Sequence, residues 1–180
     1  MKTLILLRHA KSGWDDGIAR DFDRPLNGKG ERAARTVGRR LREDGLTFDQ
    51  VVASSAVRVR ETLAQLWLGY GTTPDVTFDT GLYLATVDGL LDRVQQTEDS
   101  VDRLLLVGHN PGLEDLVLTL VPDHPDDRLR DDVEEKFPTA SVAVLALAID
   151  SWTAAKPGAG KLERFIRPRD LDPALGPDRG

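Results

Sequence analysis

The sequence predicts an α/β protein in which helices cover both faces of a largely parallel central sheet, a three-layer α/β/α sandwich. Two observations lead to this class. Short apolar runs alternate along the chain with segments whose apolar residues recur at helical spacing. The runs at 4–7 and 104–107 are apolar throughout, which is typical of strands buried on both faces of a sheet.

The 180 residues fit a single domain. We predict that this domain covers residues 1–167. Pro, Gly and Asp are frequent over residues 168–180, so we expect a flexible C-terminal tail there.

Composition narrows the classes of function. The chain has no cysteine, which removes thiol nucleophiles, disulfides and cysteine-based zinc sites. Its net charge of −6 argues against nucleic-acid binding. No apolar stretch is long enough for a membrane span, and the run at 4–7 is too short for a signal peptide. We expect a cytoplasmic protein that binds neither nucleic acid nor a membrane, and leave its oligomeric state open.

Strands and helices are predicted to alternate in chain order. They are a strand at 4–7, a helix at 28–43, a strand at 49–53, a helix at 56–68, a strand at 76–78, a helix around 90–94, a strand at 103–107, a helix at 111–120, and strands at 141–149 and 161–166.

Local signals support the helix boundaries. Asn27 can cap the first helix, and Gly45 can stop it. Asn110 and Pro111 resemble an N-cap and a first helical residue. The long polar loop at 12–25 is of a kind that is often functional, whereas the Asp- and Pro-rich segment at 122–135 is expected to be an exposed excursion.

Three predicted strands end in polar residues. The first ends in Arg8 and His9, the second is followed by Arg58, and the fourth by His109. Because the carboxyl ends of parallel strands lie at one edge of a sheet, we expect these side chains to converge. Forked arginine donors and helix N-termini favour phosphate, and a histidine among them can accept a phosphoryl group on a ring nitrogen.

Each residue alone has a simpler interpretation. A lone histidine at a strand end is usually structural, and Arg58 could lie on a helix surface. Lys11 and Ser12 could contact phosphate, although a loop lysine more often faces solvent. The prediction therefore depends on the convergence of these residues.

In this order and spacing, a set of motifs resembles the histidine phosphatase superfamily, specifically its SixA-like phosphohistidine phosphatase branch, over residues 3–166. The matching stretches are Leu7-Arg8-His9-Ala10-Lys11-Ser12, Asp23-Arg24-Pro25-Leu26-Asn27-Gly28-Lys29-Gly30, Ser54-Ser55-Ala56-Val57-Arg58 with Glu61-Thr62, Leu82-Tyr83, Val107-Gly108-His109-Asn110-Pro111-Gly112-Leu113-Glu114 and Phe137-Pro138-Thr139-Ala140-Ser141.

The resemblance implies a phosphoglycerate mutase-like fold and a role for several residues. His9 would be the phosphorylated nucleophile, Arg8 and Arg58 would bind phosphate, and His109 would contact the transferring group. Further substrate contacts are expected from the neighbouring polar residues Lys11, Ser12, Asn110 and Thr139. The resemblance implies no metal and no organic cofactor.

One departure from the family pattern bears on the substrate. Many members of the superfamily carry a glutamate as general acid near the position of Gly81, and the carboxylates here, Asp79 and Asp88, do not match it cleanly. A leaving alkoxide needs a proton far more than a leaving imidazole does. We therefore predict a phosphatase for protein phosphohistidine.

Three alternatives stay open at the level of sequence. The chain could hydrolyse small phosphomonoesters with Asp79 or Asp88 as acid. It could be a regulatory module that binds phosphate without catalysis. A metallohydrolase that uses His9 and His109 is a third hypothesis, but the arginines would repel a cation.

Overall fold

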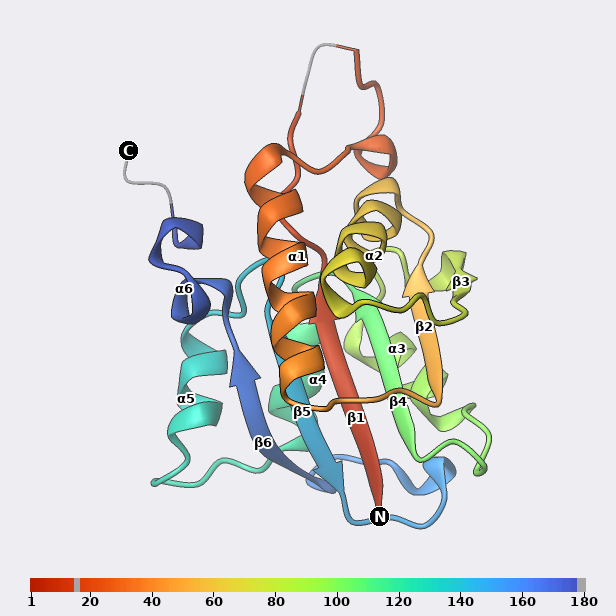
Figure 1. Ribbon diagram of the computed structural model, residues 1–180. Helices are drawn as coiled ribbons and strands as arrows, with labels where there is room; N and C mark the ends of the chain where they lie inside the picture. Colours follow the sequence, from red (N-terminus) through yellow and green to blue (C-terminus); the bar gives the residue numbers. More distant parts are fainter. Residues whose placement is uncertain (15–16, 178–180) are drawn as a thin grey trace.

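The computed structural model describes residues 1–14 and 17–177 and confirms the predicted class (Figure 1). Asp15 and Asp16 of the predicted loop and residues 178–180 of the predicted tail lie outside the described residues. Within the described part, a six-stranded sheet has the order β3-β2-β4-β1-β5-β6. Its strands are β1 (Lys2–Arg8), β2 (Gln50–Ser54), β3 (Thr77–Asp79), β4 (Arg103–Gly108), β5 (Val142–Leu147) and β6 (Gly160–Ile166).

The sheet is parallel from β3 to β1 and antiparallel at β5 and β6. Helices form a layer on each face, with α1 and α2 in front of the sheet in Figure 1 and α3 and α4 behind it. The helices are α1 (Gly28–Glu43), α2 (Val57–Tyr70), α3 (Val87–Gln95), α4 (Gly112–Leu120), α5 (Arg128–Glu135) and α6 (Pro168–Leu171), with short 3-10 helices at Asp21–Asp23, Thr80–Leu82, Trp152–Ala154 and Pro173–Leu175.

β1 is the centre of the molecule, between β4 and β5. Successive side chains of a strand point to opposite faces, so Leu4 and Leu6 join the core under α3 and α4, whereas Ile5 and Leu7 join the core under α1 and α2. All four are fully buried, and each contributes roughly 2 kcal/mol through its removal from water. This double anchorage fixes where the chain leaves the sheet, at Arg8.

The start of α1 confirms its predicted cap, since the Asn27 side chain accepts a hydrogen bond from the Gly30 amide at 2.8 Å. Further along, α1 crosses α2 closely at Gly38. A Cβ atom at Gly38 would lie 2.1 Å from the carbonyl oxygen of Leu66, so only glycine permits this approach.

The predicted start of α4 is wrong by one residue. The helix begins at Gly112, and Pro111 occupies the capping position. The Asn110 side-chain oxygen still accepts from the Glu114 amide in the first turn at 3.3 Å. Its amide nitrogen donates to the carbonyl of Phe137 at 3.0 Å, which ties the segment after β4 to the segment before β5.

The predicted excursion at 122–135 is wrong over its second half, where α5 forms. Val133 is fully buried, and Arg130 is 8% exposed. Arg130 donates to the carbonyls of Leu118 at 3.3 Å and Val121 at 2.9 Å, at the C-terminal end of α4. A cation at that position satisfies carbonyls that the helix leaves unpaired, so the acidic composition of the segment concealed a structural helix.

The sequence predicts a flexible tail from residue 168, but the structure places α6 and a 3-10 helix there. Leu171 and Leu175 pack against the core under α1 and α2. The Lys29 ammonium also donates to the carbonyl of Gly176. These contacts hold residues 168–176 against the N-terminal half of α1.

No helix in the described part of the chain combines the length and the apolar character needed to cross a bilayer.

Candidate active site

A cavity of about 340 Å³ opens at the carboxyl edge of the parallel strands. The eight residues that the sequence predicts as catalytic or substrate-binding line it, together with Arg24 and Leu84, which the sequence did not mark. The candidates are Arg8, His9, Lys11, Ser12, Arg58, His109, Asn110 and Thr139. The structure therefore confirms that these strand ends converge on one cavity. It does not by itself assign a chemical role to each residue.

Backbone contacts fix Arg8 and His9 at the end of β1. The Ala140 amide lies within 3.1 Å of the Arg8 carbonyl and 3.0 Å of the His9 carbonyl. Ala140 has a φ of 60°, which non-glycine residues adopt rarely and mostly where the surroundings enforce it. On the other side, the Ala10 amide donates to the Thr62 hydroxyl of α2 at 2.9 Å. The two site residues are thus held by β1, α2 and the loop before β5.

The loop after His9 rests on the start of α1. A Cβ atom at Gly30 would lie 2.1 Å from the Lys11 carbonyl oxygen, so glycine allows the loop and the helix to touch. The Asn27 amide donates to the same carbonyl at 3.0 Å. This explains why the Asn27–Gly30 segment belongs with the site in the sequence pattern.

His9 is 7% exposed, and its protonation pattern follows from one contact. The ring Nδ1 lies 2.8 Å from the Ala10 carbonyl oxygen, which can only accept, so Nδ1 carries the hydrogen and Nε2 carries the lone pair. Burial, followed by the charges of Arg8 and Arg58, lowers the pKa of His9 to about 3. The ring is therefore neutral at pH 7, as a nucleophile must be.

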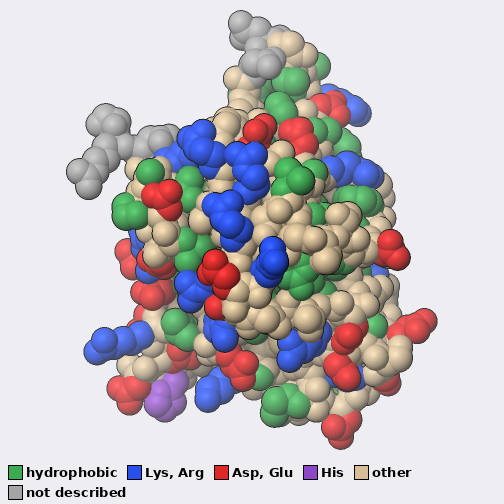
Figure 2. All heavy atoms as spheres, viewed as in Figure 1, with side chains coloured by type: hydrophobic (Ala, Val, Ile, Leu, Met, Phe, Trp, Pro, Cys, Tyr) green, Lys and Arg blue, Asp and Glu red, His purple; other side chains and the backbone are tan. Residues whose placement is uncertain are grey.

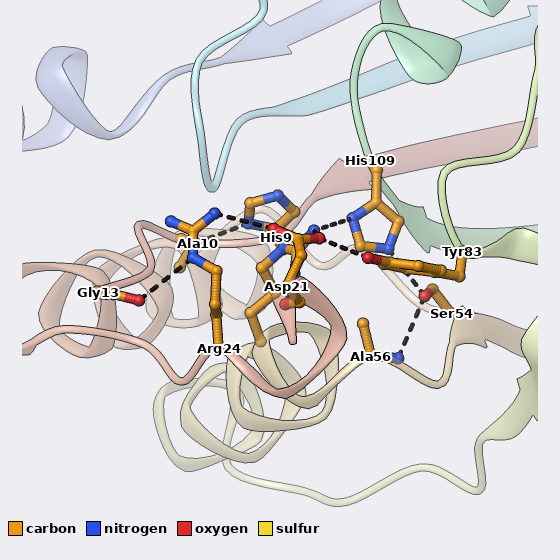
Figure 3. A network of polar contacts seen from close by, with 10 residues as sticks. His9, Ala10, Gly13, Asp21, Arg24, Ser54, Ala56, Tyr83 and His109 are labelled. Carbon is orange, nitrogen blue, oxygen red and sulfur yellow. Dashed lines mark hydrogen bonds and ion pairs between the residues drawn. The ribbon is translucent and has the colours of Figure 1, made fainter. Parts of the chain in front are cut away.

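His109 has the opposite tautomer. Its Nδ1 lies 3.4 Å from Nη2 of Arg58, which can only donate, and its Nε2 lies 2.8 Å from the Ser54 hydroxyl (Figure 3). Nδ1 therefore carries the lone pair, and Nε2 donates to Ser54. Burial, followed by the charge of Arg58, lowers the pKa of His109 to about 4. The rings of His9 and His109 lie side by side, with centroids 5.2 Å apart.

Arg58 is 4% exposed and is held by a residue that sequence reasoning missed, Asp21. The guanidinium donates to the Asp21 carboxylate at 3.0 Å and to its backbone carbonyl at 2.8 Å. The Tyr83 hydroxyl donates to the same carboxylate at 2.5 Å (Figure 3). The hydrogen bonds from Tyr83, Arg24 and Arg58 lower the pKa of Asp21 to about 2.

Arg8 approaches the cavity from the other side. One terminal nitrogen donates to the Phe137 carbonyl at 3.0 Å. Its Nε is buried with no hydrogen-bond partner among the described residues. Burial lowers the pKa of Arg8, which expresses the cost of holding this charge away from water. An anion beside Arg8 and Arg58 would offset that cost.

The carboxyl groups considered as general acids do not line the cavity. Asp79 accepts from the Gly81 amide and pairs with Arg93 at 3.4 Å, and Asp88 is exposed on α3. Burial raises the pKa of Glu114, but this residue also lies outside the cavity lining. Asp21, which contacts Arg58, is too acidic to hold a proton at neutral pH. Among the described residues, no carboxyl group is placed to protonate a leaving group.

No group of three or more His, Cys, Asp or Glu side chains in the described residues could hold a metal ion.

The fold and this site together define an α/β protein with a cationic, histidine-containing cavity at the carboxyl edge of its sheet. Residues 4–82 match the model of the histidine phosphatase superfamily, branch 1. An uncharacterised protein of Mycobacterium tuberculosis is 37% identical over 164 residues, which cover 91% of this chain and all of the relative. The chain belongs to the histidine phosphatase superfamily.

Solved structures agree with this assignment. A protein of Nakamurella multipartitia described as a candidate SixA phosphohistidine phosphatase is 30% identical, with a TM-score of 0.79 over 93% of this chain and 96% of that one. A protein of Agrobacterium tumefaciens with the same description is 28% identical, with a TM-score of 0.75 over 92% of this chain and 97% of that one. The phosphoglycerate mutase-like fold that the sequence predicted is confirmed.

Proposed function

We propose that this protein is a phosphatase that transfers a phosphoryl group to Nε2 of His9 and then to water, with protein phosphohistidine as its substrate. One observation carries the proposal. His9 is neutral, presents Nε2 as its unprotonated nitrogen and shares a cavity with Arg8, Arg58 and His109.

The proposed reaction has two steps. The substrate phosphohistidine reacts with its second ring nitrogen protonated. The lone pair on His9 Nε2 attacks phosphorus while the bond to the substrate's leaving nitrogen breaks, which gives phosphorylated His9 and a neutral substrate imidazole. Water then attacks the phosphorus, the bond to Nε2 breaks, and inorganic phosphate leaves. Arg8 and Arg58 stabilise the charge on the equatorial phosphoryl oxygens in both transition states.

The hydrogen bond from His9 Nδ1 to the Ala10 carbonyl has a part in both steps. It fixes the ring orientation, and it stabilises the positive charge that the ring acquires when Nε2 is phosphorylated. The contact with Ser54 orients the His109 ring in the cavity, which supports a role for its Nδ1 in accepting a proton from the attacking water in the second step.

The substrate class follows from the carboxyl groups. A phosphomonoester releases an alkoxide, which needs a proton donor in the cavity, and no described carboxyl is placed to serve. A phosphohistidine whose second ring nitrogen is protonated releases a neutral imidazole, which needs no proton donor in the cavity. The likeness to proteins described as SixA phosphohistidine phosphatases supports the same choice.

A matched pair of peptides tests the substrate class. One peptide carries phosphohistidine and the other phosphoserine at the same position in the same sequence, and kcat/KM is measured for each at neutral pH. We expect the phosphohistidine peptide to react faster. Faster hydrolysis of phosphoserine would favour a phosphomonoesterase instead.

Two controls separate the remaining alternatives. If His9→Ala left the activity unchanged, the nucleophile would lie elsewhere, and if the wild-type protein bound phosphate without turnover, it would be a regulatory module. A loss of activity in a metal chelator would indicate a metallohydrolase, whereas we expect none.

A further inference from the structure

A second, larger cavity adjoins the candidate active site. It has a volume of about 480 Å³, and it shares Arg8, Lys11 and Thr139 with the first. The start of α1, the loop before β5 and the C-terminal helices form its walls. The basic side chains in the wall are Lys29, Lys136, Arg167 and Arg169, and apolar ones such as Ala33, Pro168 and Leu175 lie between them. A substrate bound at His9 would therefore meet a cationic groove as it leaves the cavity.

Not every cation in this groove is equally available. Arg167 pairs with Asp170 at 2.8 Å, and the Lys29 ammonium donates to the Gly176 carbonyl. In the described part of the chain, Lys136 and Arg169 form no ion pair. Lys136 is exposed and Arg169 is half-buried. These two side chains are the strongest candidates for contact with an external anion.

The positive surface continues beyond the groove. A neighbouring hollow shares Leu175 and is lined by Arg32, Arg35 and Arg39 of α1, with Asp172 as its one acidic side chain. Figure 2 shows Lys and Arg side chains gathered over α1 on this face of the molecule. From Lys29 to Arg39 the helix rises by about 15 Å, which is too long for one small metabolite anchored at His9.

Charge and length together identify the occupant. The whole chain carries a net charge of −6, so a basic strip that starts at the site is a local reversal of sign. Clusters of arginine and lysine are a recurring way to bind acidic segments of proteins. We infer that the groove and the adjoining face of α1 bind an acidic polypeptide segment that flanks the phosphorylated residue of the substrate. This inference rests on the proposed function, because it assumes a protein substrate.

Phosphohistidine peptides with different flanking sequences test the inference. One set carries Asp and Glu on one side of phosphohistidine, a second carries them on the other side, and a third carries Gln and Asn instead. We expect one acidic set to exceed the neutral set in kcat/KM by about tenfold at 50 mM salt. The preference should fall below about twofold at 300 mM salt, because salt screens exposed charges.

Variants of the groove test whether its basic side chains cause the preference for acidic flanks. Lys136→Glu combined with Arg169→Glu should abolish the preference for acidic flanks, and the milder pair Lys136→Gln with Arg169→Gln should reduce it. Lys161→Glu is the matched control, since this exposed lysine lies at the far end of β6 and should leave the preference intact. Thermal unfolding of each variant shows whether it is folded.

Two outcomes would overturn the inference: equal kcat/KM for acidic and neutral peptides in the wild type, or a preference that the double variants retain. If the proposed function itself is wrong, the result is different, because no phosphohistidine peptide is hydrolysed at all. In that case the same flanks around phosphoserine still measure whether the groove selects acidic segments.

Discussion

Asp21 and Arg58 are 37 positions apart in sequence and are joined by two hydrogen bonds at the wall of the site cavity, one to the Asp21 carboxylate at 3.0 Å and one to its carbonyl at 2.8 Å. The pair links the loop after β1 to the first turn of α2. It orients a guanidinium that lines the cavity, but it also places a negative charge beside the cavity in which the proposed function requires a phosphate dianion to bind.

This conflict predicts the effect of Asp21→Asn. Asparagine can still accept from Arg58, but the negative charge is gone. We expect inorganic phosphate to inhibit three- to tenfold more strongly, an order of magnitude set by the Coulomb energy near a protein surface. Competitive inhibition constants provide the measurement. Asp23→Asn is the control, because Asp23 pairs with exposed Arg20. Weaker inhibition in Asp21→Asn would mean that the carboxylate is needed to hold Arg58.

Replacing Arg58 should lower kcat/KM far more than replacing Arg60, the next arginine on α2. Arg58→Ala removes a fixed positive charge from the cavity and should lower kcat/KM on the order of 10²- to 10³-fold. Arg60 is exposed, donates to the Ser55 carbonyl and stacks over Phe78, so Arg60→Ala should cost less than threefold. A loss below tenfold in Arg58→Ala would show that Arg58 is peripheral.

Alanine substitution at two adjacent buried serines, Ser54 and Ser55, should have very different effects on stability and on kcat. The Ser54 hydroxyl contacts His109 Nε2 at 2.8 Å and accepts from the Ala56 amide at 3.3 Å. Ser54→Ala leaves both donors unsatisfied and should destabilise the fold by about 1–3 kcal/mol.

The same change should lower kcat by about tenfold, because His109 loses the contact that orients its ring. The Ser55 hydroxyl is buried without a hydrogen-bond partner in the described residues, so Ser55→Ala should leave both quantities nearly unchanged. Chemical denaturation and steady-state kinetics measure the two effects. Equal behaviour of the two variants would show that Ser54 does not position His109.

The depressed pKa values of the two histidines predict how stability depends on pH. An unfolded histidine binds a proton below about pH 6.5, whereas His9 and His109 in the folded protein bind one only near pH 3 and pH 4. The unfolded chain therefore takes up more protons as the pH falls from 6.5 towards 4, and the free energy of unfolding decreases in that window.

His9→Gln isolates the contribution of one ring. The wild type should lose a few kcal/mol relative to this variant between pH 6.5 and pH 4, and the two curves should run parallel above pH 7. Urea unfolding at a series of pH values provides the measurement. Parallel curves throughout would mean that His9 has an ordinary pKa in the folded protein.

The sequence was sufficient to predict the α/β class, because the buried strands are nearly uniform apolar runs. It also placed Arg8, His9, Arg58 and His109 together, since strand ends in a parallel sheet share an edge. The predicted lining residues Lys11, Ser12, Asn110 and Thr139 also face the same cavity.

The side-chain contacts that hold Arg58 and His109 in place could not be predicted from the sequence. Ser54 and Tyr83 lie in the motifs that resemble the family, but their contacts with His109 and Asp21 join segments that are distant in sequence, and no periodicity marks these contacts. Asp21 lies outside those motifs. Their signal was faint: Asp21 lies in the long polar loop, and Ser54 ends a strand. Composition was misleading for α5 and for residues 168–176, where a few apolar or paired side chains outweigh an abundance of Asp, Pro and Gly.

The central claim is that His9 carries the phosphoryl group during turnover. Rapid acid-free quenching of the reaction with a labelled phosphohistidine peptide, followed by proteolysis and mass spectrometry, locates the label on the enzyme. We predict an acid-labile phosphate on Nε2 of His9 that is absent from His9→Gln and accumulates in His109→Gln. Label on another residue, or turnover without any labelled enzyme under conditions that trap a phosphohistidine, would contradict the account.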